Sequence, residues 1–231
     1  MKIVIFSGAG MSAESGISTF RDSGGLWENY KIEEVATPQA WQADPDLVTN
    51  FYNLRRKNIL ETHPNEAHLA IAELEEVTSV HVVTQNIDDL HERAGSTNVL
   101  HLHGNITLAK SSGPAQEKKL YPIDGWELTQ DDLCDDGYRL RPHVVWFGEA
   151  VPAYDDAATI IESADVFIVI GTSLQVYPAA GLVNYARNAH LKFLIDPNAN
   201  ELSGLNDFIV YAKPATEGMK LASSEIKKVI K

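Results

Sequence analysis

The chain has 231 residues, 44% of them hydrophobic and 22% charged, which are ordinary values for a globular protein of one large or two small domains. Its formal net charge of −13 disfavours nonspecific binding to nucleic acid or anionic membranes. The single cysteine excludes an internal disulfide and any zinc site that needs two thiolates from one chain. No apolar run approaches the length that spans a bilayer, and Lys2 to Phe6 is too short for a signal sequence, so we expect a cytoplasmic protein.

The first strand is predicted at residues 2–6, and it leads into a glycine turn over residues 8–10. A helix starting at Met11 would place unpaired N–H groups and the positive end of its dipole over the turn, which suits a phosphate. The spacing Gly-x-Gly-x-x-Ala is close to the dinucleotide-binding fingerprint, although a tight strand-to-helix turn also uses glycines. Asp22 is too close to be the acid that the fingerprint places about 20 residues further on.

Further strands and helices alternate along the chain, which indicates an α/β fold. Thr37-Pro38 predicts a helix start, and the apolar spacing is helical to Leu74. The remaining predicted strands lie at residues 80–84, 99–103, 141–146, 165–170, 191–195 and 208–211, and a Lys-rich amphipathic helix ends the chain.

Polar residues at strand ends are the candidates for ligand contact, because ligands bind outside the carboxyl ends of strands in open α/β sheets. Residues 85–88, Gln-Asn-Ile-Asp, follow one such strand, although Asn86 and Asp88 would also suit helix capping. The hydroxyl-rich turn 171–173 follows another strand and offers hydrogen bonds to phosphate or ribose. Asp196 ends a third, where it could accept hydrogen bonds from a ribose or simply form a turn with Pro197.

Two histidines, His101 and His103, are expected on one face of the strand at residues 99–103. Such a pair can bind metal, but no carboxylate or thiolate cluster accompanies it in the sequence. His103 is followed by Gly104, which leaves room for a substrate, and neutral histidine dominates near pH 7. His103 is therefore predicted to act as a general base rather than as a metal ligand.

Residues 105–140 break the alternation and indicate an inserted subdomain. Cys134 lies among four aspartates there, so like-charge repulsion is expected to raise the pKa of its thiol and to make a nucleophilic role implausible.

Five segments together resemble the sirtuins, a family of NAD-dependent protein deacylases. They are residues 8–21 (GAGMSAESGISTFR), 84–91 (TQNIDDLH), 103–104 (HG), 144–149 (VVWFGE) and 171–174 (GTSL), in the family's order and over nearly the whole chain. The likeness is greatest to small bacterial sirtuins of the deacetylase and desuccinylase branch.

This resemblance implies a Rossmann-like parallel sheet with helices on both faces, plus a smaller inserted domain. We expect the sheet domain to comprise residues 1–27, 76–105 and 141–231, with a helical module at 28–75 and the small domain at 106–140. The implied cofactor is NAD, contacted by Gly8, Ala9, Gly10, Ala13, Phe20, Arg21, Gln85, Ile87, Gly171, Thr172, Ser173 and Asp196.

The resemblance also implies the reaction. An acyl group would pass from a lysine side chain to the ADP-ribose part of NAD with release of nicotinamide, giving O-acyl-ADP-ribose, with His103 as the base and Asn86 and Asp88 beside it. The acyl-lysine peptide would add as a strand. Its predicted contacts are Ala36, Tyr52, Arg55, Val145, Phe147, Gly148, Val176 and Tyr177.

Tyr52 and Arg55 indicate the acyl group. They stand three apart in a helical pattern, and in the desuccinylating branch this pair binds the acyl carboxylate, while Ala36 leaves room for a longer chain. Acetyl, succinyl and malonyl groups all remain open, and a plain surface pair remains the alternative.

The chain departs from the family in two places. Sirtuins usually hold a structural zinc with four cysteines, whereas residues 105–140 offer only Cys134, so we predict a zinc-free small domain held by Tyr121, Trp126 and Leu133. Asp196 stands where the family commonly has asparagine. Loss of zinc keeps an NAD hydrolase or ADP-ribosyltransferase as an alternative function, with an inactive NAD-binding module as a third.

Overall fold

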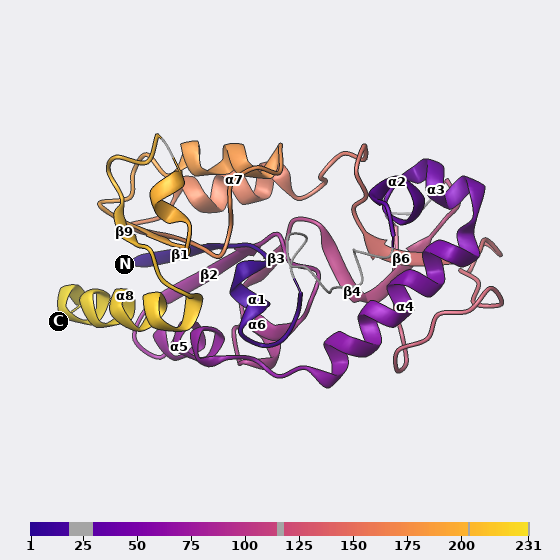
Figure 1. Ribbon diagram of the computed structural model, residues 1–231, viewed down its shortest axis with the longest axis horizontal. Coiled ribbons are helices and arrows are strands. Elements are labelled where there is room, and N and C mark those ends of the chain that lie inside the picture. Colours follow the sequence, from indigo (N-terminus) through magenta and orange to yellow (C-terminus); the bar gives the residue numbers. More distant parts are fainter. Residues whose placement is uncertain (19–29, 115–117, 203, 231) are drawn as a thin grey trace.

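The computed structural model describes residues 1–18, 30–114, 118–202 and 204–230 of the chain. It has two lobes (Figure 1), a large one around a six-stranded sheet and a small one around a three-stranded sheet. Phe20 and Arg21, predicted to contact the cofactor, lie outside the described residues. Within those residues, no helix combines the length and apolar character needed to cross a bilayer.

The large sheet has the strand order β3-β2-β1-β7-β8-β9, and every neighbouring pair is parallel. The predicted α/β class with a parallel Rossmann-like sheet is therefore confirmed. Its strands are β1 (Lys2–Ser7), β2 (Ser79–Thr84), β3 (Val99–His101), β7 (Val166–Ile170), β8 (Leu191–Ile195) and β9 (Ile209–Tyr211).

Helices cover both faces of this sheet because successive residues of each strand point to opposite sides. Ile3 and Ile5 of β1 pack with α5 (Glu66–Leu74) and α8 (Ala215–Ile230). Val4 and Phe6 pack on the other side with α7 (Tyr154–Glu162) and the 3₁₀ helix η2 (Ala179–Tyr185). The remaining short elements of this lobe are α1 (Gly10–Ala13), α6 (Leu90–Arg93) and η3 (Ala199–Glu201).

The small lobe joins an antiparallel sheet, in the order β5-β4-β6, to three helices. Its elements are α2 (Ile32–Val35), α3 (Pro38–Ala43), α4 (Pro45–Glu61), β4 (Gly104–Ser111), β5 (Leu120–Pro122) and β6 (Leu140–Val144). Thr37 caps α3 as the sequence predicts, since its hydroxyl accepts from the Ala40 N–H at 3.0 Å with Pro38 at the first helical position. Helix α4 lies against the small sheet through Phe51, Tyr52 and Ile59.

The packing favours different domain boundaries from those expected. Helix α5 contributes Ala67, Ile71 and Leu74 to the core of the large sheet, whereas β6 pairs with β4 in the small one. We therefore propose that residues 66–75 belong to the large lobe and residues 141–144 to the small lobe.

The small sheet has its own apolar core, but not the predicted one. Trp126 and Leu133 are 38% and 54% exposed, and only Tyr121 of the predicted trio packs against this core. Its buried members are Ala109, Leu128, Cys134 and Leu140. Trp126 instead presents its ring to the Lys57 ammonium, 5.2 Å from the ring centroid.

Cys134 also differs from its predicted behaviour. Its side chain is buried in the core rather than surrounded by the aspartates, and its Sγ lies 3.3 Å from Ser111 Oγ. This hydrogen bond holds the pKa of the Cys134 thiol below its ordinary value, so the expected rise was wrong in direction. Burial leaves the thiol poorly accessible to substrates.

We expect the small lobe to fold without metal, because its core is built from apolar side chains around one cysteine. Adding a chelator such as EDTA to the protein as purified should leave its midpoint of thermal unfolding unchanged. Stoichiometric zinc in elemental analysis, or a chelator-induced fall of several degrees, would contradict this expectation.

A buried pair of histidines lies between α5 and α6. His68 and His91 are 0% and 1% exposed, and their rings pack edge to face with 4.9 Å between centroids. Burial lowers the pKa of His68 to about 4 and lowers the pKa of His91 well below its ordinary value. Both rings are therefore neutral in the native protein at neutral pH.

This pair predicts a loss of stability in mild acid. The unfolded chain takes up a proton on His68 below about pH 6.5, while the native state excludes it down to about pH 4, so stability falls as pH drops through this window. From this residue alone, the free energy of urea unfolding should fall by about 2 kcal/mol between pH 7.5 and 5. His68→Gln should reduce this loss of stability, whereas the control His190→Gln, at an exposed site, should not. If the wild type and both variants showed the same pH dependence, the loss would not come from His68.

Candidate active site

The turns after β1 and β7 pack backbone against backbone. The N–H of Gly8 donates to Ile170 O at 3.0 Å, and the N–H of Gly10 donates to Gly171 O at 2.8 Å. A Cβ on Gly10 would come within 2.9 Å of Gly171 Cα, and one on Gly8 within 2.7 Å of Thr172 Cβ. Only glycine fits at these two positions, because the two turns approach too closely for a side chain. The surface at the ends of these strands is therefore formed by backbone atoms.

The glycine turn differs from the expectation in one respect. Met11 N–H donates to Gly8 O at 2.9 Å and Ser12 N–H to Ala9 O at 3.1 Å, so these groups are already paired within the turn. Helix α1 is a single turn, and its dipole is correspondingly small. Ala9 and Ala13 are exposed at its surface.

A buried polar network joins α1 to the segment after β2. Ser12 Oγ donates to Asp88 Oδ2 at 3.0 Å and accepts from Asn86 Nδ2 at 3.1 Å. Asp88 Oδ1 accepts from the N–H of Leu90, the first residue of α6, at 3.2 Å, although the N-cap residue of that helix is Asp89, which makes no side-chain cap bond. Burial raises the pKa of Asp88 against these hydrogen bonds.

Ser12 was not among the predicted site residues, although it is 1% exposed and bonds to two of them. A serine after Gly-x-Gly reads as a helix-start residue in the sequence, and its partners lie 74 and 76 residues away. Only the parallel pairing of β1 with β2 brings them together.

His103 lies at the junction of the two lobes, between β3 of the large sheet and β4 of the small one. Its Nδ1 lies 2.9 Å from the carbonyl oxygen of Gln85. Because a carbonyl can only accept, Nδ1 carries the proton and Nε2 keeps a lone pair. Burial lowers the pKa of His103, so the ring is neutral near pH 7 and its Nε2 can take a proton.

Gly104 makes this junction possible, since its φ is +83° and a Cβ would lie 2.1 Å from His143 O. We expect Gly104→Ala to destabilise the protein by at least the strain of its φ, about 1–3 kcal/mol, and to displace His103. Gly125→Ala is the matched control, because Gly125 also has a positive φ, +72°, but its Cβ would meet open space. Urea unfolding of both variants measures the difference, and equal losses would contradict the steric argument.

Tyr52 and Arg55 lie on α4 beside the junction. Tyr52 is 2% exposed, and burial raises the pKa of its hydroxyl to about 12, so the hydroxyl remains a donor. Burial also lowers the pKa of Arg55, while Tyr52 and the strand-end carboxylate of Asp88 raise it. The neighbouring Arg56 is fully buried and donates to Ile106 O at 2.6 Å.

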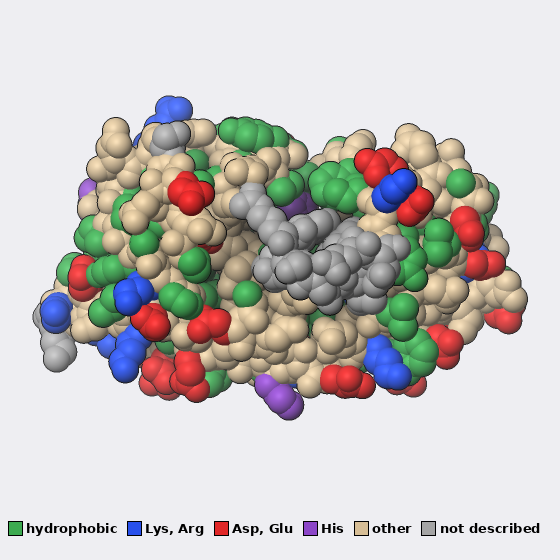
Figure 2. All heavy atoms as spheres, in the orientation of Figure 1, with side chains coloured by type: hydrophobic (Ala, Val, Ile, Leu, Met, Phe, Trp, Pro, Cys, Tyr) green, Lys and Arg blue, Asp and Glu red, His purple; other side chains and the backbone are tan. Residues whose placement is uncertain are grey.

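The segment after β6 joins the same region. The N–H of Val145 donates to His103 O at 2.9 Å, and the N–H of Phe147 donates to Ala36 O at 3.0 Å. Phe147 is 44% exposed, and Val176 and Tyr177 of the loop after β7 are 41% and 77% exposed. Figure 2 shows a notch between the two lobes with histidine atoms visible in it.

Gln85 Nε2 donates to Thr172 Oγ1 at 3.1 Å, which links the ends of β2 and β7. Asp196 Oδ1 accepts from the Asn198 N–H at 2.9 Å and so closes a turn, the simpler of its two interpretations. Its contact with a ribose stays a prediction. The contacts of Ile87 and Ser173 with the cofactor and of Gly148 with the peptide also stay predictions.

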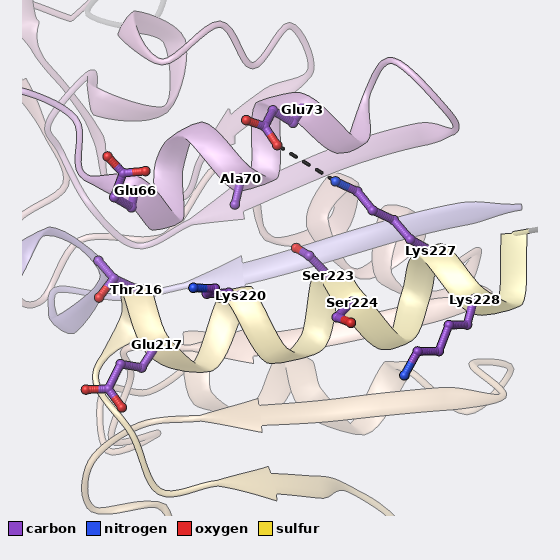
Figure 3. A pocket seen from close by; sticks show the side chains of 10 residues that line it. All are labelled: Glu66, Ala70, Glu73, Thr216, Glu217, Lys220, Ser223, Ser224, Lys227 and Lys228. Atoms are coloured by element: carbon purple, nitrogen blue, oxygen red, sulfur yellow. Dashed lines mark ion pairs between the residues drawn. The ribbon is translucent and has the colours of Figure 1, made fainter.

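A separate groove runs between α5 and α8 (Figure 3), and the ion pair of Lys227 with Glu73, at 3.8 Å, spans it. None of the predicted site residues lines it. The candidate active site is instead the junction of the lobes.

Comparison with known proteins agrees with this geometry. Residues 8–178 match the profile of the Sir2 family. This chain belongs to the Sir2 family. It is 51% identical over 222 residues to an NAD-dependent protein deacylase of Bacteroides thetaiotaomicron, with 94% of each chain covered. It superposes with a TM-score of 0.88 and 39% identity on a Sir2 homologue–NAD complex, covering 100% of this chain and 91% of that one.

A second Sir2 structure contains a deacetylated peptide and 3′-O-acetyl ADP ribose. It is 30% identical with a TM-score of 0.78, covering 96% of this chain and 92% of that chain. In the present Sir2 chain, the paired glycine turns and the strand-end groups fit a dinucleotide, because backbone and small polar groups face the place where phosphates and riboses bind in parallel sheets.

Proposed function

We propose that this Sir2 chain is an NAD-dependent protein-lysine deacylase. His103 carries the proposal, because a buried neutral imidazole with its Nδ1 proton held by Gln85 O has its basic Nε2 at the junction of the lobes. The relatives named as NAD-dependent protein deacylases support the same assignment.

When bound, NAD supplies the ribose carbon that accepts the acyl oxygen as nicotinamide leaves. The chain's own residues hold the cofactor and move the proton. Gly8, Ala9, Gly10 and Ser173 would hold the pyrophosphate, while Asn86 and Asp88, which both bond to Ser12, would line the ribose and nicotinamide pocket. His103 Nε2 would take the proton of a ribose hydroxyl, whose oxygen then bonds to the acyl carbon; the bond from that carbon to the lysine nitrogen breaks with uptake of one water, which leaves the lysine as a free amine.

The acyl-lysine would enter between the lobes as an added strand. The exposed apolar side chains of Phe147, Val176 and Tyr177 supply surface for such a peptide on both sides of the junction. The coarser assignment, an acyl-lysine protein or peptide substrate, agrees with the peptide in the related Sir2 structure.

We further propose that the acyl group carries a carboxylate. Arg55 is a cation half-buried on α4, and the Tyr52 hydroxyl is a protonated donor one helical turn away. Together they match the single negative charge of a succinyl or malonyl group. Ala36 is 3% exposed and belongs to the same buried cluster as Tyr52, where its small side chain would leave room for a longer acyl chain.

Transfer of acyl groups is favoured over NAD hydrolysis or ADP-ribosyl transfer by these same groups, because hydrolysis needs no acyl pocket. The test is incubation of the purified protein with matched acetyl-lysine and succinyl-lysine peptides, with and without NAD, read by mass spectrometry. Acyl removal that requires NAD supports the proposal. Nicotinamide release with both peptides intact would favour the alternative.

A further inference from the structure

Both ring nitrogens of His101 lie at hydrogen-bond distance from an oxygen acceptor. Its Nδ1 lies 2.9 Å from the backbone oxygen of Asn86, and its Nε2 lies 2.7 Å from Glu92 Oε1 on α6. Neither a carbonyl nor a carboxylate oxygen can donate, so both ring nitrogens must carry protons. The geometry therefore requires an imidazolium, in contrast to the neutral ring of His103 two residues later.

The charged groups around the ring are consistent with this state. Burial opposes the charge, but the hydrogen bond and charge of Glu92, the Asn86 carbonyl and the charge of Asp88 together raise the pKa of His101. Burial likewise opposes the charge of Glu92, yet the hydrogen bond from His101 keeps the pKa of Glu92 below its ordinary value. His91 is the remaining titratable group coupled to the ring, and Asn105 Nδ2 lies 3.5 Å from Nε2.

The bond from His101 completes the restraint of Asn86. The Asn86 N–H donates to Thr84 Oγ1 at 3.0 Å, its carbonyl accepts from His101, and its side-chain amide donates to Ser12 Oγ. The preceding carbonyl, Gln85 O, accepts from His103. Two histidines on one face of the chain thus hold two successive carbonyls of the segment after β2.

We propose that His101, held as an imidazolium by Glu92, is a positioning residue that fixes Asn86 for NAD binding. The proposal rests on the proposed function in so far as Asn86 lies in the NAD site. The charge state of His101 follows from the geometry and is tested independently of any activity.

Imidazole ¹⁵N NMR of the histidine-labelled protein tests the charge state. At pH 7.5 both ring nitrogens of His101 should show the shifts of a protonated ring, while His103 shows a neutral ring protonated on Nδ1. In Glu92→Gln, His101 should become neutral at the same pH, since its carboxylate partner is lost. A neutral His101 ring in the wild type would overturn the proposal.

Calorimetric titration with NAD tests the positioning role. His101→Leu should weaken NAD binding about tenfold, the size of one lost charge-assisted hydrogen bond. Glu92→Gln should weaken it less, because a neutral ring can still donate from Nδ1 to Asn86 O. Glu73→Gln, on the solvent side of α5, is the control and should bind as the wild type does.

An unchanged NAD affinity in a folded His101→Leu protein would overturn the role. So would equal losses in His101→Leu and Glu73→Gln. If the wild type bound no NAD at all, the proposed function would fail instead, and the NMR result would still decide the charge state. Should His101→Leu fail to fold, Glu92→Gln and the NMR measurement remain decisive.

Discussion

Replacing His103 with alanine is expected to slow NAD-dependent deacylation by about 10²–10⁴-fold, the usual contribution of a general base. The Nε2 that takes the ribose proton is lost. His101 cannot replace it, because the Nε2 of His101 is bonded to Glu92. Initial rates of lysine-peptide deacylation, followed by mass spectrometry at saturating NAD, measure the effect.

NAD affinity should change little in His103→Ala, since the glycine turns and the network of Ser12, Asn86 and Asp88 remain. His190→Ala, at an exposed position before β8, is the control and should turn over normally. Turnover of His103→Ala near that of the wild type would contradict the role of His103 and revive the inactive NAD-binding alternative.

Replacing Arg55 with methionine is expected to lower kcat/KM for a succinyl-lysine peptide by about tenfold to a hundredfold, with little effect on an acetyl-lysine peptide. A hydrogen-bonded ion pair with the acyl carboxylate contributes about 1.5–3 kcal/mol net. An acetyl group has no carboxylate and makes no such pair, so its removal should not depend on Arg55. Tyr52→Phe should act in the same direction but more weakly, because it removes a neutral donor.

Lys57→Met is the matched control for Arg55→Met, since it removes a cation from the exposed side of the same helix. Arg56→Met would be misleading, because Arg56 is buried and holds Ile106 O and Asn53 in the small lobe. Equal losses for the acetyl and succinyl peptides in Arg55→Met would show that Arg55 supports the fold or the cofactor rather than the acyl carboxylate.

The parallel sheet could be predicted because its central strands β1 and β7 contain short apolar runs. Both faces of these strands are buried, over Ile3 to Phe6 and Val166 to Ile170. A continuous apolar run of four or five residues is typical of such a buried parallel strand and is shorter than a typical helix. The cap Thr37 was equally local, and it lies where a helix begins.

The small lobe could not be predicted in the same way. Its core is thin, and its members come from residues as far apart as Ala109 and Leu140. Trp126 and Leu133 are large apolar residues of that stretch, yet they are exposed, while Cys134 is buried. Hydrophobicity ranks residues, but the pairing of β4 with β6 decides which of them face inward.

Candidate site residues could be named from the sequence, but the hydrogen bonds between them could not. The strand-end positions of Asn86, Asp88 and His103 follow from the pattern, whereas the bonds of Ser12 and the pairing of His101 with Glu92 depend on contacts across the sheet. The N–H groups of Met11 and Ser12 were expected to be unpaired, but a one-turn helix closes on itself.

The most direct test of the account is the product ratio of one reaction with NAD and an acyl-lysine peptide, quantified by mass spectrometry. The account predicts nicotinamide, free-lysine peptide and O-acyl-ADP-ribose in equal amounts, all abolished together in His103→Ala. Nicotinamide formed with plain ADP-ribose while the peptide keeps its acyl group would contradict it, and would mean that this Sir2 chain hydrolyses NAD.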